Sequence, residues 1–541
     1  MRATLPTAIV FGLLAGAVLG ASVDQAKAAD ISVTKPDGTE IVAAGEDFAG
    51  RRFSDPWDMS SPIDLSHGVY FNQLRDVRWK NGVFTATSTG ADPHVYPLFA
   101  GYLGGLPNGR DGIINRFPTT NYDRFGIRLY SSRATSAQFI WLYNQVFTDI
   151  GVKTFAVQPG WNIYTVDPTA RGWSGKPMGL RFDPTNESGV KFKIDWLRLY
   201  RNTDTGLEIA WTDSNPGGTV DIYLDDDTNA DNGNLGLIAG QASQANNSYS
   251  WKTSAYPGGT YYIYIAKPGE PGSYSGAAAI NEPPLTKLLD PDERGGKDYA
   301  ATLSGGPWNM RSANDINSIS GISDLSFANG ILAGTTRSSD SFFHLRVLSP
   351  IDTAKYHRLS FRYRYSGTFD YGLGTIARFI WSPNQHHLYE YQTLKDIVAY
   401  PSWTDYYIDL TKAPLSAGHI GWNGNMTVFR FDPLETPPPR RFYLDYVRLK
   451  ADDSANSRFT IKWRDDRPNP RSTRVSLYYD TNRTGYNGRL IKSNRLQTAG
   501  VNRYDWNTSG ISAGTYWVYV IATDGIGMTR KYATGPLKIS H

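Results

Sequence analysis

Two pairs of aspartates stand where carboxylate chemistry could occur. Asp183 lies in Arg-Phe-Asp-Pro and Asp195 in Asp-Trp-Leu-Arg-Leu, and Asp432 and Asp445 form a matching second pair. A glycosidase needs two carboxyl groups about 5 to 10 Å apart, one acting as acid and the other as base or nucleophile. The alternative is structural, because Arg-Phe-Asp-Pro suits a turn and the later aspartate suits an ion site or a loop cap. We favour the structural interpretation and predict no catalytic residue.

Other catalytic patterns are weaker. None of the eight histidines belongs to a His-Glu-x-x-His motif or a comparable ligand spacing. The one Gly-x-Ser-x-Gly motif, at 510–514, precedes a strand pattern, whereas a nucleophile elbow precedes a helix. Its counterpart at 255–259 replaces the serine with a turn proline, Pro257. A glycan-cleaving enzyme is therefore one alternative hypothesis and not the preferred one.

Aspartates also suit calcium, whose ligands are carboxylate and carbonyl oxygens. Exported proteins meet enough calcium to fill weak sites, so we expect structural calcium in each half of the chain. The candidate ligands, in order of position, are Asp47, Asp64, Asp195, Asp298, Asp315 and Asp445.

The segment DDDTNAD offers a separate calcium candidate. Asp225, Asp227, Asn229 and Asp231 alternate along it as ligands do in an EF-hand loop. The glycine expected at the sixth position is Ala230, however, so a solvated acidic turn is an equally good interpretation.

Tryptophans with polar neighbours are the candidate ligand-binding residues. Sugar-binding sites stack an aromatic ring on a pyranose and bond its hydroxyls with a few polar groups. Trp173 and Trp422 have glycines close on both sides, which predicts exposed loops and makes them the preferred platforms. Two Trp-x-x-Asn-Gln segments offer the same mixture, with Trp141, Asn144, Gln145, Trp381, Asn384 and Gln385.

These residues recur because the chain is an internal duplication. AQFIWLYNQ at 137–145 returns as ARFIWSPNQ at 377–385, and LRFDPTNESGVKFKIDWLRL returns as FRFDPLETPPPRRFYLDYVRL. PWDMSSPIDL also returns as PWNMRSANDI, carrying Trp57 to Trp308. Since Asp58 becomes Asn309, a carboxylate is not needed there in both copies. We expect these two tryptophans to be buried against the closing strand of each unit.

Short alternating strands and Asn-Gly turns predict an all-β chain. SWTDYYIDL and FYLDYVRL resemble the closing strands of galactose-binding or carbohydrate-binding-module jelly rolls. GTYYIYIA and GTYWVYVI resemble immunoglobulin-like or fibronectin-III-like modules. The resemblance implies two jelly-roll β-sandwiches alternating with two smaller immunoglobulin-like β-sandwiches. The expected boundaries are 1–28 for a signal peptide, 29–202 and 285–452 for the jelly rolls, and 203–284 and 453–541 for the small domains.

The bulk composition fits an exported protein. Arg2, an apolar run and Ala-Lys-Ala at 26–28 have the layout of a secretory signal peptide. No later segment is long and apolar enough to span a membrane. There are no cysteines, which excludes disulfides and thiolate sites, and a formal charge of +4 makes a nucleic acid an unexpected partner.

The resulting hypothesis is a secreted, non-catalytic protein that binds a polysaccharide or a cell-surface glycan through two duplicated modules. The expected location is extracellular or on the cell surface, with the periplasm as an option. A structural surface-layer, filament or matrix protein that self-assembles is the alternative from a different class.

Overall fold

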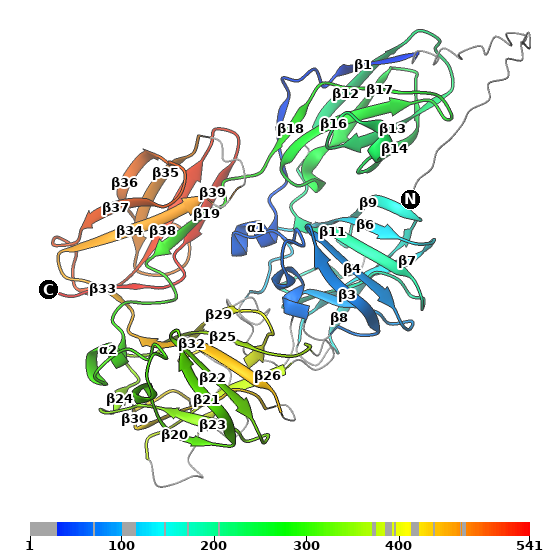
Figure 1. Ribbon diagram of the computed structural model, residues 1–541. Coiled ribbons are helices and arrows are strands. Elements are labelled where there is room, and N and C mark those ends of the chain that lie inside the picture. Colours follow the sequence, from blue (N-terminus) through cyan, green and yellow to red (C-terminus); the bar gives the residue numbers. More distant parts are fainter. Residues whose placement is uncertain are drawn as a thin grey trace, which may run out of the picture.

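The computed structural model describes residues 30–68, 71–99, 115–144, 148–169, 172–203, 206–369, 375–384, 392–393, 397–412, 421–435, 439–465, 467 and 472–541. The chain is all-β: antiparallel sheets dominate, and the α-helices described are two short ones, α1 (Phe48–Phe53) and α2 (Tyr299–Leu303). Four β-sandwiches are visible, a large and a small one in each repeat (Figure 1).

The first large sandwich has the strand order of a jelly roll. Most neighbours in its sheets are not consecutive in sequence, as Greek-key connections require. Its five-stranded sheet runs β3 (Leu74–Lys80), β4 (Val83–Ser88), β11 (Lys191–Tyr200), β6 (Arg124–Ser131), β9 (Gly160–Val166). Its four-stranded sheet runs β5 (Val95–Leu98), β10 (Gly179–Asp183), β7 (Thr135–Leu142), β8 (Ile150–Val157).

The second large sandwich repeats this order. Its five-stranded sheet runs β21 (Ile322–Ala328), β22 (Ile331–Thr336), β32 (Arg441–Lys450), β25 (Arg358–Tyr365), β29 (Thr404–Asp409). The opposing sheet runs β20 (Ile316–Ser320), β23 (Phe342–Leu345), β31 (Val428–Asp432), β26 (Thr375–Ser382), β27 (Gln392–Thr393), and β28 (Ile397–Ala399) also pairs with β26. A two-stranded ribbon, β24 (Ile351–Asp352) with β30 (Asn425–Met426), completes it.

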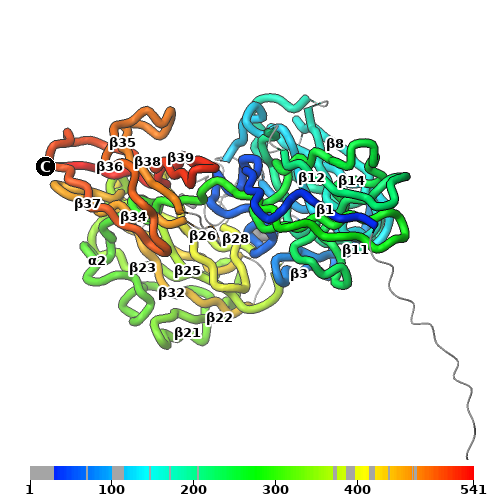
Figure 2. Tube along the Cα trace, turned by 90° about the horizontal axis from the view of Figure 1, so that it is seen from above, coloured from blue at the N-terminus to red at the C-terminus, as the bar shows by residue number. Residues whose placement is uncertain are grey.

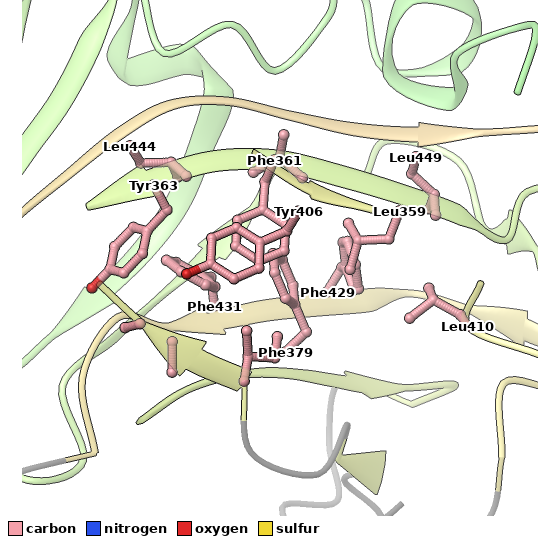
Figure 3. Packing of buried hydrophobic residues seen from close by; sticks show 14 of the residues in the cluster. Leu359, Phe361, Tyr363, Phe379, Tyr406, Leu410, Phe429, Phe431, Leu444 and Leu449 are labelled. Carbon is pink, nitrogen blue, oxygen red and sulfur yellow. The ribbon is translucent and has the colours of Figure 1, made fainter. Parts of the chain in front are cut away.

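Aromatic side chains fill the space between the two sheets of each large sandwich. In the second one, Phe361 of β25 stacks on Tyr406 of β29 with ring centroids 4.4 Å apart. Phe379 and Phe431 meet them from the opposing sheet, as Figure 3 shows. Alternation along each strand places these residues inside and their neighbours outside, so the outer faces carry the polar residues.

The small sandwiches also match each other. In the first, β1 (Ile31–Lys35), β12 (Gly206–Asp213) and β15 (Ser248–Lys252) face β14 (Gly236–Ser243), β13 (Thr219–Asp225), β16 (Gly259–Ala266), β18 (Ala278–Asn281) and β2 (Ile41–Ala43), with β17 (Ser273–Tyr274) on β16. In the second, β19 (Thr286–Asp290), β34 (Arg458–Asp465) and β37 (Asn502–Asn507) face β33 (Asp453–Ala455), β40 (Leu537–Ile539), β38 (Gly514–Thr523), β35 (Arg474–Asp480) and β36 (Arg489–Leu496), with β39 (Met528–Tyr532) on β38.

One feature differs from the expected boundaries. β1, β2 and β19 lie in segments assigned above to the large units, yet each hydrogen-bonds to strands of a small sandwich. Val33, for example, pairs with Trp211 of β12. Each large sandwich is therefore inserted between strands of a small one. The sequence could not show this, because a short strand's partner is set by contacts far along the chain.

The two repeats pack against each other. β7 alternates between two hydrophobic clusters: Phe139 and Trp141 point into the first large sandwich. Ile140 and Leu142 point out of it and belong to the cluster that fills the second large sandwich. In both views the repeats lie side by side (Figures 1 and 2).

Polar contacts add to this packing. Asn281 Nδ2 donates to Asp524 Oδ2 at 2.9 Å, and Lys531 of the second small sandwich donates to Ser54 beside α1. No helix of the described ranges has the length and apolar character needed to cross a membrane.

Trp57 and Trp308 are buried, as expected, each with about 1% of its surface exposed. Leu197 N donates to Trp57 O, and Val447 N donates to Trp308 O, so both tryptophans lie against the closing strand. This repeated segment is part of the core of each large sandwich.

Candidate ligand-binding surface

The outer face of the first five-stranded sheet carries a cluster of cations and aromatic rings. We call this cluster the first shelf and define it by five half-buried residues on β6, β9 and β11: Arg128, Tyr130, Trp161, Lys193 and Asp195. Ile127 and Leu129 alternate with the first two and are fully buried, so strand alternation directs the shelf outward.

The first shelf is held together by one ion pair and three cation–π contacts. Arg128 Nη1 lies 2.7 Å from Asp195 Oδ2, while the guanidinium lies 4.4 Å from the ring centre of Trp161. Lys193 Nζ lies 4.8 Å from the ring of Tyr130 and 5.8 Å from that of Trp161. The rings of Tyr130 and Trp161 meet edge to face at 5.7 Å. Such contacts fix flat side chains on a sheet surface.

The second large sandwich repeats the cluster on the equivalent strands. This second shelf comprises Arg362, Arg364, Trp403, Tyr443 and Asp445, all half-buried. Arg362 Nη1 lies 2.9 Å from Asp445 Oδ2, and its guanidinium lies 4.9 Å from the ring of Trp403. The Arg364 guanidinium lies 3.9 Å from the ring of Tyr443 and 5.2 Å from that of Trp403.

Three positions are identical between the shelves and two have exchanged their chemistry. Aligning the repeats places Tyr130 on Arg364 and Lys193 on Tyr443. The β6 position is thus aromatic in one copy and cationic in the other, and the β11 position changes in the opposite sense. Both repeats therefore place a cation beside an aromatic ring at these two positions, although the residue at each position differs. This reciprocal exchange indicates that the contact itself matters.

The two shelves differ in how open they are. Arg128 Nε donates to Leu235 O of the adjacent small sandwich at 2.8 Å, and its side chain is 12% exposed. The Arg362 side chain is 40% exposed and has no such bond among the described residues. Arg364 likewise shows no carboxylate partner within the described ranges, and its Nε is buried without a hydrogen bond. The second shelf therefore offers the more accessible surface and an uncompensated cation.

The two tryptophans preferred as platforms in the sequence analysis are less exposed than expected. Trp422 is only 7% exposed, and Trp173 is half-buried. Their indole nitrogens donate to Tyr356 O and Tyr122 O, both at 2.9 Å. The glycines beside Trp173 adopt left-handed φ angles, +75° at Gly172, which turns the loop inward over the sandwich. The flanking glycines predict exposure, but here they allow a tight turn that brings the ring against the sandwich.

The tryptophans of the Trp-x-x-Asn-Gln segments lie in the cores of the large sandwiches. Trp141 and Trp381 are fully buried and meet Trp173 and Trp422 edge to face at 4.9 and 5.1 Å. Gln145 and Gln385 lie outside the described residues.

The two asparagines of these segments lie in turns. Asn144 bonds to Thr148 through both its amide nitrogen and its oxygen, which closes a local turn. Asn384 N donates to Ser382 Oγ. The asparagines lie in local turns, and the tryptophan rings of the same segments are buried, so no ring face is open for a sugar to stack on.

The aspartate pairs cannot act as catalytic dyads. Asp183 lies on the outer face of the four-stranded sheet and bonds to Arg181. Asp195 lies on the outer face of the opposite sheet, with Arg128. The sandwich core separates them, and Asp432 and Asp445 are separated in the same way. Ser512 stands in a loop that leads into β38, so the Gly-x-Ser-x-Gly motif lacks the helix that a nucleophile elbow requires.

The expected calcium ligands are dispersed. Asp47 and Asp298 are N-caps: each accepts a backbone N–H, from Gly50 at 2.7 Å and from Ala301 at 2.8 Å. Burial raises the pKa of Asp47 to about 6. Asp195 and Asp445 belong to the shelves, and burial raises the pKa of Asp315, which nearby backbone N–H groups partly offset.

The carboxylates of the described residues that lie close enough to share an ion are instead those of Asp55, Asp58 and Asp64, whose oxygens fall within 4.8 Å of one another. Asp64 was expected; the other two were not.

The DDDTNAD segment uses its side chains locally. Asp225 is buried and accepts a hydrogen bond from Tyr274 Oη at 2.6 Å. Asp227 accepts from Asn229 N and from Asn232 Nδ2, both at 2.7 Å, and Asn229 accepts from Asp231 N. These bonds close the turn and the short 3-10 helix η4 (Ala230–Asn232), as Asx turns do.

Comparisons with known proteins support part of this architecture. Residues 200–277 match the family model "Kre9/KNH-like N-terminal Ig-like domain", so the first small sandwich is immunoglobulin-like. No curated protein sequence matches the chain.

Among solved structures, similarity is weak. An agarase matches at 10% identity with a TM-score of 0.20, over 27% of this chain and 26% of that one. The FN1–FN3 domains of chicken CNTN1 match at 11% with a TM-score of 0.13, over 63% and 96%. A biofilm-associated protein's BSP domain matches at 9% with a TM-score of 0.13, over 88% and 69%. At these TM-scores the three structures support no argument about fold or function.

Proposed function

We propose that this is an exported, non-catalytic protein that binds a polysaccharide or a surface glycan through its two shelves. One observation carries the proposal. The same combination of a tryptophan, an Arg–Asp pair and a cation beside an aromatic ring stands at equivalent positions of both repeats, with Trp403 immediately before β29. The carbohydrate-binding jelly-roll resemblance of the closing strands agrees with it.

The chemistry of a shelf suits a sugar ring. The tryptophan supplies an apolar face for stacking, and the arginine and aspartate beside it supply a donor and an acceptor for hydroxyl groups. Half-buried side chains held by neighbours lose little freedom on binding. Two such sites on one chain strengthen binding to a repetitive polymer, because the second contact forms at high effective concentration.

The test replaces the tryptophans and measures binding to a panel of insoluble and soluble polysaccharides. We expect Trp403→Ala to weaken binding about tenfold or more, equivalent to ~1.4 kcal/mol, because the more open shelf loses its ring. Trp161→Ala should have a smaller effect, and the double variant should abolish polymer retention. Trp517→Ala is the matched control, since Trp517 is also half-buried and lies under an arginine, Arg483 at 5.2 Å.

Unchanged binding in the double variant would overturn the assignment of the site. Absence of binding by the wild-type protein to every glycan, together with self-assembly, would favour the structural alternative. Release of reducing ends or unsaturated sugars would favour the enzyme.

We also propose that calcium binds in the first repeat, at Asp55, Asp58 and Asp64. The three carboxylates are the hard oxygen ligands that calcium prefers. The second repeat has Gly306 and Asn309 at the positions of Asp55 and Asp58, so it should not bind there. Calcium should raise the thermal midpoint of the wild type, and Asp58→Asn should remove that increase. An equal increase in the variant would contradict the site.

A further inference from the structure

The two small sandwiches have large formal charges of opposite sign, and the segment of β1 and β2, residues 30–44, adds one Lys and three acids to the acidic one. Residues 203–284 contain 2 Lys or Arg and 10 Asp or Glu, a formal charge of −8. Residues 453–541 contain 14 Lys or Arg and 6 Asp or Glu, a formal charge of +8. The net +4 of the whole chain conceals this separation. Two copies of one ancestral domain have thus diverged in opposite electrostatic directions.

These charges are not neutralised within one chain. In the described part of the first small sandwich, ion pairs involve Lys35 with Asp37 and Glu40, Lys267 with Asp213, and Glu282 with Arg198 of β11. The two small sandwiches touch through Asn281 Nδ2, which donates to Asp524 Oδ2, and through Arg467 Nη1, which donates to the backbone oxygen of Glu282. The acidic loop residues Asp226 and Asp231 are exposed.

The basic charge is concentrated on an edge strand. β36 pairs with β35 on one side alone, and it carries Arg489 and Lys492, both exposed, and the half-buried Arg495. Leu490 and Leu496 on the same strand are 52% and 53% exposed. An edge strand that presents apolar and cationic side chains together is suited to contact with an acidic partner.

The equivalent edge of the first small sandwich carries shorter side chains. β14 carries Ala239 and Ala242 where β36 carries Lys492 and Arg495. In place of those long side chains lies an open hollow of about 460 Å³, lined by the two alanines, Ser243 and Tyr249. Arg495 lies 5.5 Å from the ring of Tyr504, the counterpart of Tyr249. The acidic loop, 225–231, leads directly into β14.

β14 and β36 cannot meet within one chain. They lie toward opposite sides of the molecule in both views (Figures 1 and 2). A contact between them requires two molecules.

We infer that the acidic first small sandwich of one chain binds the basic second small sandwich of another copy, with the β36 edge on the β14 edge and its acidic loop. The two surfaces differ, so the contact is heterologous, and its repetition gives an open chain or a ring. The partner is a second copy because the opposite charges belong to homologous domains of the same chain. This inference does not depend on glycan binding.

The test measures self-association of the full chain by sedimentation velocity, with chelator present so that calcium does not neutralise the acidic loop. We expect association in low salt that weakens about tenfold or more in 0.5 M NaCl, because exposed charges are screened over a few ångströms there. A variant carrying Arg489→Glu and Lys492→Glu should remain monomeric. So should a variant carrying Asp226→Lys and Asp231→Lys.

Mixing these two variants should restore association, since each supplies the charge that the other has lost. Arg75→Glu with Lys80→Glu is the control, because it changes the net charge equally on the edge strand β3 of a large sandwich and should leave association intact. A wild-type protein that stays monomeric in low salt would overturn the inference. So would failure of the mixture to associate, or loss of association in the control. If wild type is monomeric but retains dextran sulfate through Arg489 and Lys492, the basic edge is a polyanion site instead.

Discussion

At the scale of single residues, the duplication allows each position of one repeat to be compared with its equivalent in the other. His357 and Arg358 correspond to Asp123 and Arg124 in the first repeat. His357 Nδ1 lies 3.1 Å from Asp409, and its Nε2 lies 3.5 Å from Asp452. Burial alone lowers the pKa of His357, but these two carboxylates outweigh it and raise the pKa to about 9. The first repeat has no histidine at this place.

This difference predicts a pH dependence confined to the second repeat. A histidine whose folded pKa lies above its unfolded value of 6.5 stabilises the fold fully below pH 6.5 and loses that contribution as the pH rises through 9. Calorimetry between pH 6 and 10 should show that the free energy of unfolding of the second large sandwich falls by about 2 kcal/mol. The loss is limited to this size because Arg358 remains paired with Asp409 and Asp452. His357→Gln should remove this slope. A slope unchanged in that variant would contradict the assignment.

The tryptophans give a second prediction at this scale. Trp422→Ala should destabilise the second large sandwich by about 3–5 kcal/mol, because it removes a large buried ring and leaves a cavity. Trp403→Ala should cost under about 1 kcal/mol, since its ring lies on an outer face. The free energy of unfolding of each variant is measured in urea, with hydrogen exchange of the β26 and β31 amides reporting the second large sandwich. Similar costs for both variants would mean that the burial difference does not control stability.

At the scale of elements, the exchanged pair on the shelves can be tested by converting one copy into the other. Tyr130→Arg alone places two cations side by side across β6 and β11, which should cost about 0.5–1 kcal/mol. Adding Lys193→Tyr recreates the Arg–Tyr contact of the second repeat and should recover most of that loss. Hydrogen exchange of β6 and β11 in the four-member cycle measures the coupling. Additive effects would show that the two positions exchanged independently.

The elements also show what the sequence could and could not predict. Alternation and turn residues were sufficient to predict an all-β chain, because those signals are local. The repeated segments were sufficient to predict the duplication and the burial of Trp57. The burial of Trp173 depends on Tyr122 O and Trp141, which are far away in sequence, so flanking glycines gave the wrong expectation. The shelves depend on register between β6, β9 and β11. Trp161 and Trp403 begin the matching segments WNIYTVD and WTDYYID, and this repeat, together with the alternation around Arg128, is the signal that could have revealed the shelves.

At the scale of the whole molecule, the apolar contact between the repeats should hold the two large sandwiches together. Leu142 is about 1% exposed and contributes to the cluster of the second repeat. Leu142→Asp should separate the repeats, because an unpaired buried carboxylate is costly, and small-angle X-ray scattering should show a larger radius of gyration. Gln138→Asp, on the same face of β7 but outside that cluster, is the control. An unchanged radius of gyration in the Leu142 variant would mean that the polar contacts between the repeats are sufficient to hold them together.

The insertion of each large sandwich within a small one has a consequence for the order of folding during synthesis. β1 and β2 emerge first, yet their partners β12 and β18 follow only after the whole first large sandwich. The same delay separates β19 from β34. The large sandwiches can therefore close as soon as they are made, while the small ones wait with an unpaired strand. Pairings between such distant segments fold slowly, so the small sandwiches should be the last parts of each repeat to mature.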